Sequence, residues 1–223
     1  MDTIIDAFFN IDIMRQATPL LLKGAWVTLQ LCAVVILLGL FGGLGLALLA
    51  SSGSAALRLP AFVFIDIFRA IPPLILLILI YAGLPFVGVR VPPFVAVCIA
   101  FLLNNSAYFA EIFRSGIKAI PKGQMEAARA TGLSPAQAQT WVILPQAIRN
   151  VLPDLLSNVV EIVKLTSIAS VVSLSELLYS ANMARAVTYN SSPLVMAAGL
   201  YLLLLWPLVR VISRFQRGLS ISH

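Results

Sequence analysis

The sequence predicts an all-α integral membrane protein with five transmembrane helices. Of its 223 residues, 60% are hydrophobic and only 11% are charged, whereas a soluble domain has about 25% charged residues. Long stretches also carry no charged residue at all, and a membrane-spanning helix needs roughly 20 mainly apolar residues. These stretches are 24–57, 70–89, 91–110 and 186–209.

Five spans and one long polar connection form a single predicted transmembrane domain over residues 1–223. The fourth span is assigned although it contains Glu161 and Lys164. The uncharged interval 130–148 is not assigned as a span, because its glutamines and prolines argue against burial in lipid. The spans are expected at about 25–50, 59–82, 92–113, 151–172 and 194–212, and the polar connection at about 115–149.

Basic residues indicate the orientation of these spans. The side that carries the polar connection and the C-terminal tail has nine lysines and arginines, and the opposite side has four. Short loops rich in lysine and arginine stay in the cytoplasm. The connection is therefore expected in the cytoplasm and, with five spans, the N-terminus outside it, in the periplasm.

Glycines and prolines predict the geometry of the first two spans. Four glycines allow close approach of another helix to the first span. Pro72 and Pro73 remove two backbone donors and are expected to bend the second span. The glycines are Gly39, Gly42, Gly43 and Gly45.

The polar connection is expected to form two short helices. One covers Glu126–Thr131 and ends at Gly132, which suits a left-handed cap. The next begins with Ser134 as N-cap and Pro135 at the first helical position. From the residues alone, this segment either lies on the lipid headgroups or presents an alanine-rich surface, formed by residues 127, 128 and 130, to another protein.

The same segment resembles the cytoplasmic "EAA" loop of ABC-importer permeases. In that family the loop forms a coupling helix that docks on a cytoplasmic ATPase. Val142 stands where isoleucine is usual, which is a conservative departure. The motif residues, to which the resemblance assigns ATPase coupling, are Glu126, Ala127, Ala128, Gly132, Leu144 and Pro145.

The rest of the chain resembles the polar amino-acid uptake branch of that family (the histidine, glutamine and arginine type). The matching stretches are "FRAIPPLILLILIYAGLP", "NNSAYFAEIFRSGIKAIPKGQMEAA", "LPQAIRNVLPDLLSN" and "KLTSIASVVSLSEL". The branch usually has aspartate after the lysine of the last stretch. This chain has Leu165 there, so a common acidic position is apolar.

The resemblance implies a permease subunit that moves polar amino acids across the bacterial inner membrane by alternating access. It implies three protein partners: a cytoplasmic ATPase dimer, a second permease subunit in a homodimer or heterodimer, and a periplasmic amino-acid-binding protein. No nucleic-acid partner is expected. The sequence has no glycine-rich phosphate loop, so we expect no enzyme activity and no cofactor on this chain, with ATP and magnesium bound by the ATPase. The sole histidine, His223, gives no basis for a metal site.

Polar residues inside the spans are the candidates for binding substrate, since ionisable groups at membrane depth are costly. Glu161 and Lys164 either pair with each other or face the ammonium and carboxylate of an amino acid. Polar neighbours either complete the pocket or bond between and within helices. These neighbours are Asn104, Asn105, Tyr108 and Ser167.

Two further charged pairs lie nearer the cytoplasmic ends of the second and third spans. Asp66 is expected to pair with Arg69, and Glu111 with Arg114, because each pair is separated by three residues on one helix face. These ion pairs are expected to fix the helix ends or to gate the inner mouth of the pathway.

Three alternative functions fit the residues less well. An importer of another small zwitterion or charged solute, such as an opine or a compatible solute, differs only in the charge balance of its pocket. An intramembrane enzyme would need Glu161 and Lys164 as its catalytic pair and leaves the polar connection unexplained. A channel or secondary transporter predicts inverted repeats, and none is visible in the sequence.

Overall fold

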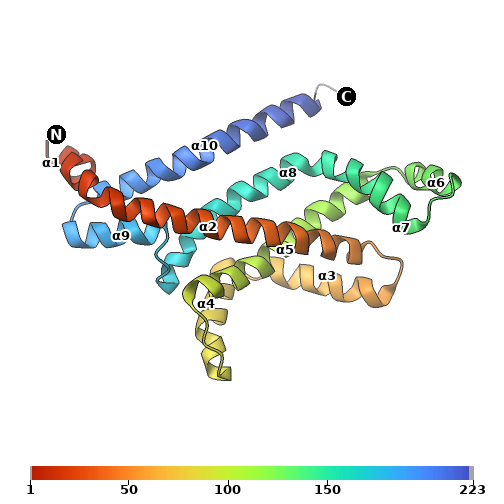
Figure 1. Cartoon of the computed structure of the whole chain (residues 1–223), viewed down its shortest axis with the longest axis horizontal. Helices are drawn as coiled ribbons and strands as arrows, with labels where there is room; N and C mark the ends of the chain where they lie inside the picture. Colours follow the sequence, from red (N-terminus) through yellow and green to blue (C-terminus); the bar gives the residue numbers. More distant parts are fainter. Residues whose placement is uncertain (1, 221–223) are drawn as a thin grey trace.

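The computed structural model describes residues 2–220, and these are entirely helical apart from short connections (Figure 1). His223 lies outside the described residues. The helices are α1 (Asp2–Phe9), α2 (Ile11–Ala50), α3 (Ala55–Ala70), α4 (Pro73–Gly83), η1 (Leu84–Val87), α5 (Pro93–Ala119), α6 (Lys122–Ala130), α7 (Pro135–Ala138), the π-helical η2 (Gln139–Ile143), α8 (Leu144–Leu165), η3 (Thr166–Val172), α9 (Leu177–Thr188) and α10 (Ser192–Ser220).

The prediction of an all-helical membrane protein is confirmed for the described residues. Four helical segments are long and apolar enough to cross a membrane, and a bent pair of helices would make a fifth crossing. The four segments are Ile4–Ala50, Pro93–Ala119, Pro135–Val172 and Ser192–Arg214, and the bent pair is Ala55–Ala70 with Pro73–Val87.

Helices α2 and α8 begin well before the predicted spans. Helix α2 begins at Ile11, where the side chain of Asn10 caps it by accepting from the backbone of Ile13. Its 40 residues give a length of about 60 Å, which exceeds the roughly 30 Å of a hydrocarbon core. Helix α8 begins at Leu144 rather than near residue 151, because Pro145 is tolerated in the first turn of a helix.

The predicted bend at the paired prolines is confirmed and is large. Helices α3 and α4 are inclined by 99° at the break between Ala70 and Pro73. As a result α4 leaves the bundle and projects from its side in Figure 1. Pro72 sits in an extended conformation and Pro73 opens the new helix, as expected for residues that cannot continue the old one.

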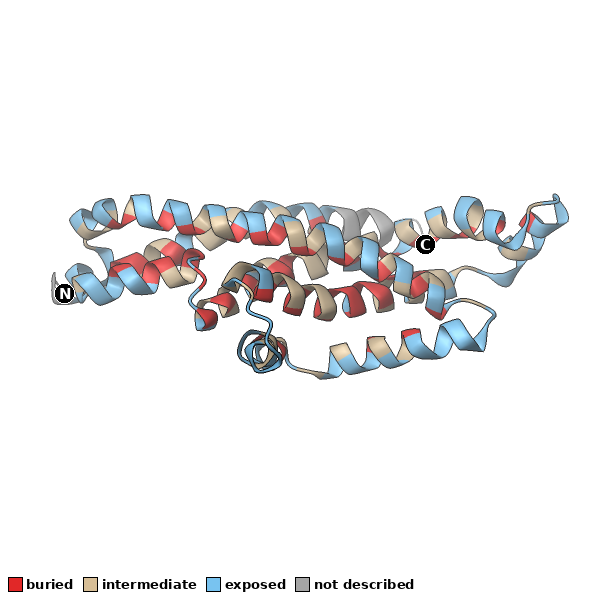
Figure 2. Ribbon diagram, turned by 60° about the horizontal axis from the view of Figure 1, so that its bottom comes forward, coloured by how far each residue is buried: buried red, intermediate tan, exposed pale blue. Residues whose placement is uncertain are grey.

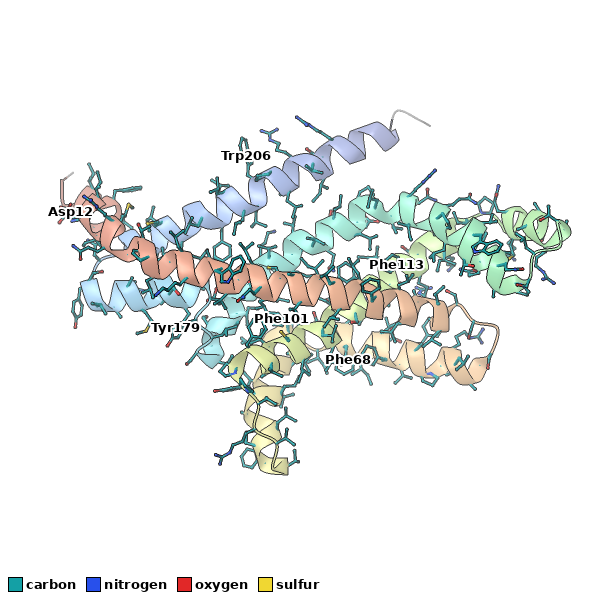
Figure 3. The ribbon with its side chains drawn as sticks, in the orientation of Figure 1. Asp12, Phe68, Phe101, Phe113, Tyr179 and Trp206 are labelled. Atoms are coloured by element: carbon teal, nitrogen blue, oxygen red, sulfur yellow. The ribbon has the colours of Figure 1, made fainter. Side chains whose placement is uncertain are left out.

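The core lies mainly between α2, α5 and α8. Figure 2 shows most of the buried residues on α5, α9 and the facing side of α2, whereas α3 is exposed over most of its surface. In Figure 3 Phe101 and Phe113 of α5 lie behind α2, while Trp206 stands on the outer side of α10. This core holds α5 and α8 together, and their polar residues meet at the side where α4 begins.

Candidate functional site: a polar cavity between α4, α5 and α8

A cavity of about 460 Å³ lies where α5, α8 and the start of α4 meet. This volume is in the range of small-molecule sites. All six residues that the sequence marks as substrate candidates line it. The lining residues are Pro73, Asn104, Asn105, Tyr108, Asn158, Glu161, Lys164, Leu165, Ser167 and Ile168.

Glu161 and Lys164 form an ion pair inside this cavity. Lys164 Nζ lies 2.7 Å from Glu161 Oε1, across one turn of α8. The pairing that the sequence left open is therefore present, yet both side chains remain accessible, at 67% exposure for Glu161 and 53% for Lys164. The pair offers a carboxylate and an ammonium side by side to a molecule in the cavity.

The polar residues of α5 and η3 are partly engaged in structural hydrogen bonds. Asn104 Nδ2 donates to the carbonyl of Phe68 at 2.8 Å and so ties α5 to the end of α3. Asn105 Nδ2 donates to the carbonyl of Phe101, one turn earlier in its own helix. Ser167 Oγ donates back to the carbonyl of Lys164, which is the bond within the helix that the sequence left as an alternative.

Asn158 is a lining residue that the sequence did not single out. Its Nδ2 atom is buried and has no hydrogen-bond partner within the part of the chain that the structure describes. A buried donor without a partner is unusual in a folded protein. Helical spacing could have revealed it, because Asn158 lies three residues before Glu161 on the same face of α8.

The charged residues at the ends of the second and third predicted spans pair differently from the prediction. Glu111 does pair with Arg114 through two hydrogen bonds. Arg69, however, pairs with Glu111 of α5 at 3.7 Å instead of with Asp66 of its own helix. Arg69 also stacks on the ring of Tyr108, 5.7 Å from its centre, so its side chain points towards α5. The predicted pair between Asp66 and Arg69 is therefore wrong.

The polar connection forms the turns that the sequence predicts. Gly132 has φ +91°, the left-handed conformation expected after α6. Ser134 and Gln137 form a capping box at the start of α7, which satisfies the orphan donors of that helix. Helix α6 begins at Lys122, four residues earlier than expected.

One expectation for this surface needs correction. Ala128 is only 6% exposed, because α6 packs against η2 on that side. The exposed alanines of α6 are Ala127 and Ala130. Glu126 and Gly132 are also exposed, and Leu144 and Pro145 lie at the start of α8.

A second polar cluster outside the cavity was also missed by sequence reasoning. Glu176 is completely buried. Its carboxylate accepts hydrogen bonds from the backbone of Leu178 and Tyr179 and from the hydroxyl of Tyr201. The next amide, that of Leu177, donates to Thr28 of α2. The cluster fastens the start of α9 to α2 and α10.

The family model and the sequence relatives of this chain agree on one family of transport proteins. The model of the family described as "Binding-protein-dependent transport system inner membrane component" matches residues 36–221. A putative glutamine transport system permease protein of Rickettsia conorii is 37% identical over 82% of this chain and 85% of its own length. The arginine transport system permease protein ArtQ of Bacillus subtilis is 34% identical over 91% of this chain and 93% of its own.

A solved structure agrees with these relatives in fold and sequence. The crystal structure of an amino acid ABC transporter with histidines superimposes with a TM-score of 0.84 and is 37% identical. The match covers 92% of this chain and 96% of that one.

Proposed function

The chain belongs to the family of binding-protein-dependent transport system inner membrane components, and we propose that it is the permease subunit of an ATP-driven importer of polar amino acids. The observation that carries this proposal is the cavity in which Glu161 and Lys164 stand side by side among carboxamides and hydroxyls. An amino acid needs an acceptor for its ammonium and a donor for its carboxylate when it leaves water.

In this proposal the protein lies in the bacterial cytoplasmic membrane, with its N-terminus in the periplasm and α6 and α7 in the cytoplasm. The positive-inside distribution of basic residues supports this orientation. A periplasmic amino-acid-binding protein delivers the substrate. A second permease subunit completes the pathway, since four or five spans are too few to enclose it alone.

The energy comes from a cytoplasmic ATPase dimer, which binds ATP and magnesium, while this chain binds no cofactor. The ATPase docks on α6 through the exposed Glu126 and Ala127. The left-handed turn at Gly132 sets the direction of the chain after this helix. Closure of the two ATPase subunits then displaces both permease subunits between inward-open and outward-open states.

The helices that line the cavity lead directly to the docking surface. Helix α5 ends at Ala119 and α6 begins at Lys122, with only two residues between them. On the other side, α7, η2 and α8 follow one another without a break from Pro135 to Leu165. A displacement of α6 is therefore carried by packed helices to both walls of the cavity. The ion pair between Arg69 and Glu111 links α3 to α5 beside this path.

The test is ATP hydrolysis by the permease reconstituted in lipid with its ATPase and binding protein, measured across the amino acids. We expect at least one polar amino acid to stimulate hydrolysis and Glu161→Gln to lower that stimulation by about tenfold or more, because the ammonium loses its acceptor. Unchanged stimulation in Glu161→Gln would remove this residue from the site. If no amino acid stimulates the wild type, while an opine or a compatible solute does, the substrate class is wrong.

A further inference from the structure

We propose that the cavity selects amino acids whose side chain is uncharged and polar, with a carboxamide fitting best, and that Leu165 is the residue that excludes cationic side chains. This inference rests on the proposed function, because it names the substrate class of the same cavity. It is carried by the charges and hydrogen-bonding groups that line the cavity.

The cavity itself has no surplus charge. Glu161 and Lys164 are its only acidic and basic lining residues, and they form an ion pair. A substrate whose ammonium and carboxylate cancel leaves this balance unchanged. A substrate with an additional positive or negative charge would need a further counter-charge, and burying an unpaired charge is costly.

The acidic groups just outside the cavity already have basic neighbours. Arg69 lies against Tyr108, but its charge is met by Glu111. Arg114 also pairs with Glu111 and interacts electrostatically with Asp66. Lys118 also attracts Glu111, so the two carboxylates already have basic neighbours and neither is left to attract a cationic side chain.

The ion pair leaves room for the head group of an amino acid. Lys164 is bonded to Oε1 of Glu161, and Oε2 has no hydrogen-bond partner in the described part of the chain. An ammonium has three donors, so Lys164 retains capacity for a carboxylate. A substrate can thus place its ammonium at Glu161 Oε2 and its carboxylate at Lys164 without breaking the pair.

Three carboxamides are available for the side chain of the substrate. The Nδ2 atoms of Asn104 and Asn105 are already engaged, which leaves their oxygens as acceptors. Asn158 supplies the opposite function, since its buried Nδ2 lacks a partner among the described residues. A carboxamide carries both a donor and an acceptor, so its two ends match these groups.

Leu165 supplies no negative charge to the cavity, so a cationic side chain of a substrate finds no counter-charge there. It lines the cavity one turn after Glu161, four residues along α8, which places the two side chains on the same helix face. An aspartate at this position would add one negative charge beside the ion pair. The cavity would then hold a net charge that a guanidinium or ammonium side chain can neutralise.

The test is equilibrium binding of radiolabelled glutamine, arginine and glutamate to the permease–ATPase complex in lipid nanodiscs. The binding protein is left out, because its own selectivity would mask that of the cavity. We expect the wild type to bind glutamine at least about tenfold more tightly than arginine or glutamate. Leu165→Asp should shift the preference towards arginine by about tenfold or more. The control is Leu165→Asn, because asparagine has the size of aspartate without its charge, and this variant should not shift the preference.

The outcomes separate the two proposals. Wild-type binding of arginine or glutamate as tight as that of glutamine overturns the selectivity and leaves the importer function standing. A Leu165→Asp complex that gains no preference for arginine overturns the role of Leu165. If that variant does not fold, the wild-type comparison still decides the selectivity. Absence of binding for all three amino acids overturns the selectivity, and if no amino acid stimulates ATP hydrolysis in the first test either, the proposed function itself is overturned.

Discussion

Glu176 is a buried carboxylate whose hydrogen bonds all come from uncharged donors. Replacing it by alanine would leave the first amides of α9 and the hydroxyl of Tyr201 without an acceptor. Unsatisfied buried donors and a lost N-cap together cost about 3 kcal/mol. We therefore expect Glu176→Ala to lower the thermal unfolding midpoint of the purified chain in detergent by several degrees.

The matched control is Glu126→Ala, which removes an exposed carboxylate from α6. Its midpoint should stay close to that of the wild type, because surface substitutions have small effects. Equal midpoints for the two variants would show that the buried cluster does not contribute to stability.

Among single residues, the sequence identifies the charged ones that lie within a hydrophobic segment. Glu161 and Lys164 interrupt a hydrophobic run, so their importance could be inferred from position alone. Glu176 could not be recognised in the same way, because it follows the predicted span in a mixed segment. Its burial depends on Tyr201, 25 residues further along the chain, and a single sequence does not reveal that contact.

Helix α2 depends on glycine where it crosses α5. A Cβ atom at Gly43 would lie 2.5 Å from Cβ of Phe109 and 2.9 Å from the backbone nitrogen of Ala110. Neither atom can move without separating the two helices. Gly43→Ala should therefore lower the free energy of unfolding by about 1–3 kcal/mol, measured by denaturant titration in mixed micelles.

Gly45 lies on the same helix and provides the control, because no atom lies within 4 Å of an added Cβ. Gly45→Ala should raise helix stability by up to about 1 kcal/mol. If both variants shift stability in the same direction, close approach of α5 is not what requires glycine at position 43.

The sequence predicted that another helix approaches the glycines of α2 closely, but not which of these glycines it contacts. All four glycines were expected to allow close approach of another helix, yet an added Cβ meets neighbours at Gly39, Gly42 and Gly43 and not at Gly45. The extent of α2 was underestimated for a related reason. An apolar pattern reports contact with lipid, whereas the start of a helix is set by its cap, here Asn10.

The arrangement of the whole molecule was the least predictable from sequence. Paired prolines indicate a bend, but they do not say that α4 leaves α3 at 99°. The direction depends on contacts between distant segments, such as the bond from Asn104 to the carbonyl of Phe68. The candidate cavity exists because such contacts bring α4, α5 and α8 together, although all of its polar lining residues except Asn158 were recognised from the sequence.

The proposed coupling between α6 and the cavity can be tested at Gly132. An alanine there has to adopt the left-handed conformation at φ +91°, which costs about 1–2 kcal/mol and favours a different direction of the chain after α6. The cavity is built by other helices and should keep its affinity for substrate. We therefore expect Gly132→Ala to retain substrate binding and to lower ATP-driven uptake into proteoliposomes severalfold.

The control is Gly53→Ala, in a turn with open space around it, which should transport normally. Wild-type uptake by Gly132→Ala would contradict the role of this turn, and parallel loss of binding and uptake would mean that the substitution disturbs the fold as a whole.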